Sequence, residues 1–268
     1  MALSTVCSLI CFCTIGFGIC NGAPKKLAAR DLDLFLKWAE DDKQNIWELS
    51  GQFEGDIVFN HDVSKNGIIH DESRRWKNNE IPYEFDPDFP DDAKLYVDDV
   101  LKEFANVSCV KVRPKNKDDE DYVYVQNEES GCFSSVGREG GKQILNLYGD
   151  EKGKKCITKG VIIHEFLHAV GFYHQQSSHD RDDYVNINWD NIEKVHKHNF
   201  EKYSEKEVSH FGVPYDYGSV MHYSDYAFSK NGKKTIEAKK PNVTLGQRNG
   251  FSPSDVQKLN LMYNCNDV

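Results

Sequence analysis

The stretch from His164 to His174, which reads HEFLHAVGFYH, constrains this chain more than any other feature. On a helix with roughly 100° between successive residues, His164 and His168 lie about 40° apart around the axis and one turn apart along it. Gly171 lets the chain turn sharply after such a helix, so that His174 can return as a third ligand. Three neutral imidazoles suit Zn²⁺ and leave a fourth position for water. The sequence therefore predicts one Zn²⁺ per chain.

Glu165 adds a candidate catalytic group to these ligands. It projects from the position next to His164, beside the metal and not onto it. A bound zinc lowers the pKa of water to about 7, and a carboxylate at this place can take the proton. A helix that only carries surface histidines is the alternative, but the full HExxHxxGxxH pattern is far more specific than HExxH alone. The pattern favours metal-assisted hydrolysis.

Composition and the N-terminal residues narrow the class of protein. The chain has 268 residues and a net charge of −10, which argues against a nucleic-acid partner because phosphate binding needs a basic face. An apolar run from Val6 to Ile19 precedes small residues and predicts a signal peptide over residues 1–22, too short to span a bilayer comfortably. No later run approaches 18 apolar residues. We expect a secreted, freely diffusing monomer with no membrane segment.

The remaining cysteines fit an oxidising compartment. Removal of the signal peptide leaves four of them, enough for two disulfides among three possible pairings: Cys109, Cys132, Cys156 and Cys265. Asn106 and Asn242 stand in glycosylation sequons, which are short patterns that also match by chance.

Strand patterns dominate the first half of the predicted domain. Four segments rich in β-branched and aromatic residues predict strands: IPYEF from residue 81, CVKVR from 109, YVYVQ from 122 and ILNLY from 144. Helical spacing predicts helices over residues 91–104 and 158–170, another opening near Asn188, and a last one capped by Ser252 and Pro253. The order favours a twisted sheet with helices, followed by an irregular second half.

A second motif extends the zinc pattern. The stretch YGSVMHY, from Tyr217 to Tyr223, follows HExxHxxGxxH as a Met-turn does in metzincins. From about Trp76 to Cys265 the chain closely resembles the astacin family, through IPYEF, HEFLHAVGFYH, HDRDDYV, SVMHY and LGQRNGFSPSDVQKLNLMYNC. The resemblance implies an α+β, zincin-like catalytic domain of two lobes. A twisted, mostly parallel sheet and the zinc helix form the upper lobe, and the lower lobe is irregular with a C-terminal helix.

The resemblance also implies roles for single residues. Met221 is expected beneath the zinc, and Tyr223 matches the tyrosine that ligates resting zinc and then stabilises the oxyanion. Residues 130–138 match an edge strand that pairs with an extended peptide or protein substrate. The implied disulfides are Cys109–Cys265 and Cys132–Cys156. Arg248 matches a position lining the S1′ pocket, where it would favour an acidic P1′ residue, although a solvated loop arginine is an equal alternative.

An inhibitory segment precedes the domain. FEGDI, residues 53–57, resembles the family FxGD motif, so Asp56 is expected on the zinc in the precursor. The implied organisation is a pro-segment over residues 23–65, cleavage between Lys65 and Asn66, and a catalytic domain over residues 66–268. The chain ends three residues after Cys265, from which we expect a stand-alone secreted protease, by analogy digestive or venom-like.

Gln175 departs from the family pattern. The resemblance places a glutamate there, paired with the ammonium of the new N-terminus. Glutamine lacks that charge, so we expect residues 66–70 to be held loosely and activity to depend weakly on a correct N-terminus. A catalytically inactive, protein-binding relative is the alternative function, disfavoured because the zinc ligands, Glu165 and Tyr223 are all present. Another metzincin subfamily is disfavoured because the pro-segment has no inhibitory cysteine.

Overall fold

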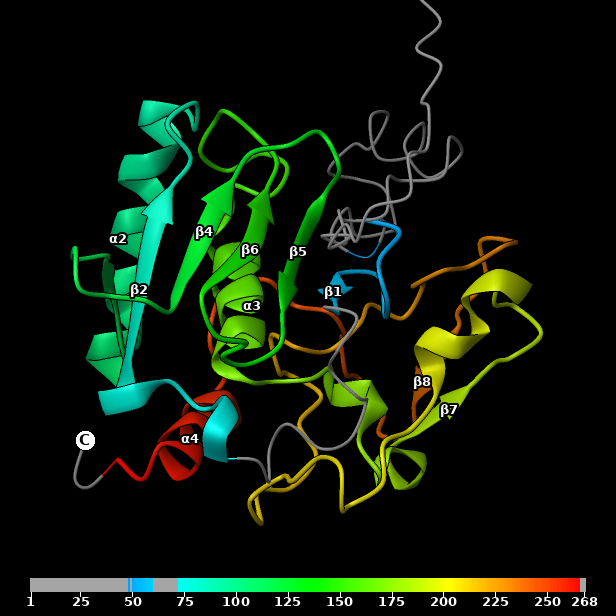
Figure 1. The fold of residues 1–268 in the computed structure, drawn as a ribbon. Helices are drawn as coiled ribbons and strands as arrows, with labels where there is room; N and C mark the ends of the chain where they lie inside the picture. Colours follow the sequence, from blue (N-terminus) through cyan, green and yellow to red (C-terminus); the bar gives the residue numbers. More distant parts are fainter. Residues whose placement is uncertain (1–47, 49, 60–71, 266–268) are drawn as a thin grey trace, which may run out of the picture.

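The computed structural model describes residue 48 and residues 50–59 and 72–265 (Figure 1). The expected signal peptide, most of the expected pro-segment, and the Lys65–Asn66 cleavage point lie outside the described residues. Among the described residues, no helix has the length and apolar character needed to cross a membrane.

A six-stranded sheet forms the upper part of the molecule, in the order β1-β5-β6-β4-β2-β3 (Figure 1). Its strands are β1 (Ile57–Val58), β2 (Glu80–Phe85), β3 (Lys111–Pro114), β4 (Tyr122–Gln126), β5 (Cys132–Ser135) and β6 (Lys142–Leu147). Only β5 and β6 pair antiparallel, and the other neighbours are parallel. The expectation of a mostly parallel sheet is confirmed, and all four predicted strands are present.

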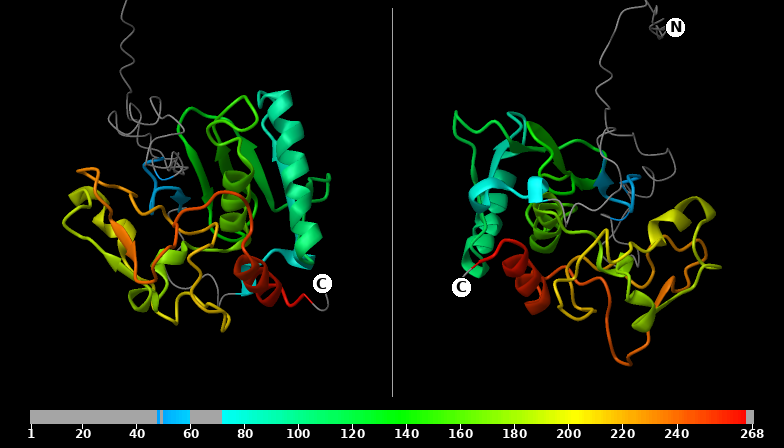
Figure 2. Two further views of the ribbon diagram at one scale, coloured as in Figure 1. Left: turned by 180° about the vertical axis from the view of Figure 1, so that it is seen from behind. Right: turned by 60° about the horizontal axis from the view of Figure 1, so that its bottom comes forward.

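Two helices cover one face of this sheet, α2 (Asp91–Val107) and α3 (Lys159–Val170), as the view from behind in Figure 2 shows. The buried side of α2 carries its apolar residues at helical spacing: Ala93, Val97, Val100, Leu101 and Phe104. By contrast, α3 is buried almost all round, because it lies between the sheet and the lower part of the chain. The sequence-based bounds of α3 are correct within one residue, and α2 is three residues longer than expected.

The chain between α3 and α4 (Pro253–Met262) is mostly irregular, with 3-10 turns and a two-stranded sheet of β7 (Val185–Ile187) and β8 (Ile236–Ala238). The predicted helix near Asn188 is wrong, because turns follow β7 and the next element is the 3-10 segment η6 (Lys194–Phe200). The side-chain amides of Asn188 and Asn191 donate to the carbonyl of Lys234 instead of capping a helix.

The last helix, α4, begins as predicted. Ser252 and Asp255 form a reciprocal capping box, and Pro253 occupies the first turn. Its buried Leu259 and Met262 pack in the same core as α2 and α3, so this helix joins the end of the chain to the sheet-bearing half.

Candidate metal centre

The helix α3 delivers His164, Glu165 and His168 to one place. All three side chains are buried. The helix ends at Gly171, whose φ of 129° and close approach to Met262 (2.5 Å from an added Cβ to Cε) exclude other residues without rearrangement. The turn brings His174 back toward the helix, with its ring centroid 5.3 Å from that of His164 and 4.8 Å from that of His168.

Each imidazole has its Nδ1 atom committed to an oxygen acceptor. His164 Nδ1 lies 2.8 Å from the Val220 carbonyl oxygen, and His168 Nδ1 lies 2.7 Å from that of Phe172. The third acceptor is a carboxylate, because His174 Nδ1 lies 2.8 Å from Glu54 Oε2. An Nδ1–H donor in each ring leaves the Nε2 lone pair free to bind a metal.

The three Nε2 atoms converge on the carboxylate of Asp56, which together with them forms a buried group of four potential ligands within 4.8 Å of one another. The Nε2 atoms of His164 and His168 lie 3.0 Å from Oδ2 and 3.4 Å from Oδ1, and that of His174 lies 3.2 Å from Oδ1. Burial raises the pKa of Asp56, but the charges of His174 and His168 outweigh it and hold the pKa well below its usual range.

Several atoms of these four residues and of the neighbouring Glu165 lack a hydrogen-bond partner within the described part of the chain. They are Asp56 Oδ1, His168 Nε2 and both carboxylate oxygens of Glu165. Buried polar atoms without partners are costly, and a cation at the point where the ligands converge would satisfy the first two. Three imidazoles and a carboxylate therefore fit zinc in donor type and number.

The carboxyl group of Glu165 is prepared to take up a proton. Burial raises its pKa well above the usual range, and the neighbouring charge of Asp56 adds to the effect. Because its oxygens accept no hydrogen bond from the described residues, a water molecule beside the metal would meet a free acceptor.

A second group of possible ligands, His179, Glu205 and His210, lacks this preparation. Its residues are partly or fully exposed. His210 Nδ1 accepts a hydrogen bond from the Gly212 amide at 3.0 Å, which places the proton of the neutral ring on Nε2. The contrast favours the buried group as the candidate metal centre.

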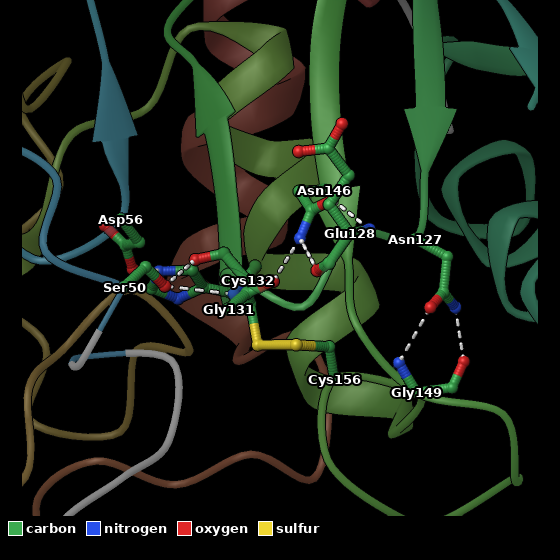
Figure 3. Close-up of a disulfide and its surroundings, with 10 residues drawn as sticks. Ser50, Asp56, Asn127, Glu128, Gly131, Cys132, Asn146, Gly149 and Cys156 are labelled. Carbon is green, nitrogen blue, oxygen red and sulfur yellow. Dashed lines mark hydrogen bonds and ion pairs between the residues drawn. A yellow bond between two sulfur atoms is a disulfide. The ribbon is translucent and has the colours of Figure 1, made fainter. Parts of the chain in front are cut away.

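The segment around Asp56 lies along the edge of the main sheet. Ile57 and Val58 pair with Ser134 and Ser135 of β5 in parallel register. Farther upstream, the Ser50 hydroxyl donates to the Cys132 carbonyl at 2.6 Å and accepts from the Cys132 amide at 3.0 Å (Figure 3). β5 lies within residues 130–138, where the sequence predicts an edge strand that pairs with an extended chain, and β1 takes that place here.

The sequence analysis did not predict the contacts that Glu54 and Glu48 make near the metal centre. Glu54 bonds to His174 and also lies 3.3 Å from the Ser177 hydroxyl. The buried Glu48 accepts from the amide of Ser224 at 3.0 Å. The FxGD pattern leaves its second position open, so nothing in the sequence marks Glu54 as a partner of a metal ligand.

Tyr223 and Met221 lie next to the centre. The Tyr223 ring centroid is 4.7 Å from that of His174, and its hydroxyl donates to the Glu54 carbonyl. Burial raises the pKa of Tyr223 well above its usual range, so the phenol keeps its proton. Met221 is buried, and its carbonyl accepts from the amide of Gln175 at 3.0 Å.

Arg248 is half-buried beside the same centre. Its Nη1 donates to the carbonyl oxygens of His222 at 3.0 Å and Gln247 at 2.9 Å. Burial lowers its pKa to about 10, and the charge of Glu48 is the largest effect opposing this. Gly160 permits this position, because a Cβ there would stand 2.0 Å from the Arg248 carbonyl oxygen.

Both disulfides form as the resemblance implies, between Cys109 and Cys265 and between Cys132 and Cys156. Figure 3 shows the second bond running from Cys132, which Ser50 contacts, to Cys156. Asn106 and Asn242 are both exposed, as glycosylation acceptors must be.

A family model decides the relationship. The model for the peptidase family described as "Astacin" matches residues 68–264. The chain belongs to the astacin family. Astacins use one zinc, and the three histidines with Asp56 form a group that could bind it.

Named astacin relatives agree with this assignment. Zinc metalloproteinase nas-13 of Caenorhabditis elegans is 46% identical over 191 residues, which cover 71% of this chain and 41% of that protein. Zinc metalloproteinase nas-4 of the same organism is 41% identical over 228 residues, covering 80% of this chain and 70% of the relative. The chain thus spans about two fifths of nas-13.

A solved astacin structure has the same fold. High choriolytic enzyme 1, a hatching enzyme zinc-protease from Oryzias latipes, superimposes with a TM-score of 0.65 at 35% identity. The match covers 72% of this chain and 94% of the hatching enzyme. The likeness confirms the α+β, zinc-protease-like architecture expected from the sequence.

Proposed function

We propose that this chain is the precursor of a secreted zinc endopeptidase that hydrolyses extracellular peptides and proteins. The observation that carries the proposal is the contact of the Asp56 carboxylate with all three histidine Nε2 atoms. The same segment pairs with β5, where an extended substrate would lie. One stretch of chain therefore blocks both the metal and the substrate strand.

The catalytic chemistry follows from residues around the metal. His164, His168 and His174 would hold the zinc, which when bound would supply Lewis acidity and lower the pKa of a water molecule. Glu165 removes a proton from the attacking water and afterwards delivers it to the leaving amine. The protonated Tyr223 hydroxyl, once released from Glu54, donates to the developing oxyanion. Met221 supports the site from below by packing.

We infer from Arg248 that the protease prefers substrates with an acidic residue at P1′. Its guanidinium lies close enough to the centre that its charge lowers the pKa of His164. In the precursor, the negative charge of Glu48 raises the pKa of Arg248 more than any other neighbouring charge does. Removal of the pro-segment would free this position for the carboxylate of an acidic P1′ residue.

The remaining assignments concern processing and setting. We infer a signal peptide over residues 1–22, a pro-segment over 23–65 and a catalytic domain over 66–268 that starts at Asn66 after cleavage behind Lys65. The two disulfides and exposed sequons at Asn106 and Asn242 support secretion. The acidic net charge of −10 supports a function without nucleic acid, and a freely diffusing monomer is the simplest state.

The test of latency replaces Asp56 by alanine in the full, uncleaved chain. We expect measurable hydrolysis of a quenched fluorescent peptide before any processing, because water then reaches the metal. Asp88→Ala, which removes an exposed carboxylate, is the matched control and should stay latent. An Asp56→Ala precursor with full zinc content and no more activity than the parent would show that another residue blocks the centre.

A further inference from the structure

Lys258 places a buried ammonium group behind the metal centre. It lies on α4, and only 8% of the residue is exposed. Its Nζ donates to the side-chain oxygen of Gln175 at 2.5 Å. Burial lowers the pKa of Lys258, an effect that the charge of Asp255 opposes most strongly.

The nearby carboxylate does not pair directly with this lysine. Asp255 accepts hydrogen bonds from the Ser219 hydroxyl at 2.6 Å and from the Val220 and Ser252 amides at 2.9 and 3.0 Å. Among the described residues, Gln175 is the hydrogen-bond partner of Lys258. A buried charge is costly unless it is hydrogen-bonded, so loss of the Gln175 contact would leave the ammonium of Lys258 poorly satisfied.

Gln175 connects this ammonium to a zinc ligand. It directly follows His174, and its amide donates to the Met221 carbonyl at 3.0 Å. The side chain thus reaches α4 while the main chain is fixed to the Met-turn. Movement of Gln175 would displace His174, because adjacent residues share a peptide plane.

A cavity adjoins the pair formed by Gln175 and Lys258. This cavity of about 40 Å³ is lined by residues that include Gln175, Lys258, Ser178, Met221 and Phe211. At roughly 10–15 Å³ per water it has room for a few water molecules. A second ammonium entering it would meet the charge of Lys258.

We propose that Lys258 is a positioning residue for the third zinc ligand: through the side chain of Gln175 it holds His174 in place from α4. The ammonium of Lys258 is a positive charge beside Gln175 that comes from the catalytic domain itself. The proposal rests on the proposed function in that it assigns His174 to the zinc. It adds that α4, outside both sequence motifs of the zinc site, determines how firmly the metal is held.

The experiment follows zinc release from the zinc-loaded full chain to an excess of chelator. Lys258→Met, Gln175→Met and the double variant are compared with the parent, with Lys94→Met on α2 as the matched control. We expect each single variant to release zinc about tenfold faster, as for other partners of metal ligands. The double variant should release it no faster than the worse single variant, because both changes break one contact.

The readout separates positioning from general support of the fold. Melting temperatures are measured on the same samples, and kcat and KM after removal of the pro-segment. Single variants that melt earlier but release zinc at the parental rate would overturn the proposal, as would a double variant whose acceleration is the product of the two singles. A parent without peptidase activity after processing would refute the proposed function, while zinc release would still decide the role of Lys258.

Discussion

The two sides of the metal centre are built in different ways. On one side, α3 carries His164, Glu165 and His168, and the helix main chain fixes all three together. On the other side, His174, Tyr223 and Arg248 come from segments without α-helix, each held by separate hydrogen bonds to side chains or carbonyls. Both sides use hydrogen bonds to the imidazoles, but the main chain of the helical side is also held by the helix and its packing, whereas the loop side depends on individual partners.

Under the proposed cleavage after Lys65, some of those partners would leave with the pro-segment. Glu54 binds both His174 and the hydroxyl of Tyr223, whereas α3 receives only the Asp56 carboxylate from the described residues of the same segment. If the chain is activated as proposed, the loop side would therefore change more than the helical side. Substitutions on the two sides should differ accordingly in size and kind of effect.

The largest effect is expected on the helical side. Glu165→Ala should lower kcat by about 10⁴-fold, the upper end for a general acid–base group, while zinc stays bound because no ligand changes. Steady-state kinetics and metal analysis of the same sample measure both. Near-parental turnover in a zinc-replete variant would remove Glu165 from the mechanism.

Tyr223→Phe should have the next largest effect, because it deletes one hydrogen-bond donor and leaves the ring packing. We expect kcat to fall about 10²-fold with little change in KM, since the hydroxyl acts only in the transition state. If KM rises and kcat does not fall, the tyrosine binds substrate and the loop side has no catalytic group of its own.

Arg248→Ser should change selectivity more than rate. Loss of a charge-assisted hydrogen bond should reduce the preference for Asp or Glu at P1′ about tenfold. Cleavage profiling of a peptide library by parent and variant provides the comparison. A parental profile without enrichment of acidic P1′ residues contradicts the assignment and leaves Arg248 as a structural loop residue.

The smallest effect concerns the new N-terminus. One residue added before Asn66 should lower kcat/KM only about twofold, the size of effect expected when a weak ion pair is lost. The effect is small because Lys258 already places a positive charge beside Gln175. In a background of Gln175→Glu with Lys258→Met, a buried carboxylate lacks its cation and the same extension should be more damaging. Equal damage in both backgrounds would show that Gln175 has not loosened this coupling.

The same division explains what the sequence could predict. The strands, α3 and the start of α4 follow from local patterns, because alternation, helical spacing and capping residues act within a few positions. The error near Asn188 arose where side-chain amides bind a carbonyl more than 40 residues away, a choice that no local pattern reveals.

Some residues of the metal centre could be predicted from the sequence, and others could not. The three histidines and Glu165 follow from spacing, and Asp56 followed from a short motif that gained weight only beside an intact zinc pattern. Glu54 and Lys258 were not predictable, since their contacts with His174 and Gln175 join segments 120 and 83 residues apart.

The pairing of β1 with β5 has a further consequence for the mature protein in solution. Loss of residues 57–58 would uncover the main-chain amides and carbonyls of Ser134 and Ser135 that β1 now covers. An open strand edge is a template for other chains, including another copy of the same protein. Here β5 is only four residues long and ends in two serines, features that limit aggregation through such an edge. The activated form would thus stay dispersed while still offering a short pairing surface to a peptide.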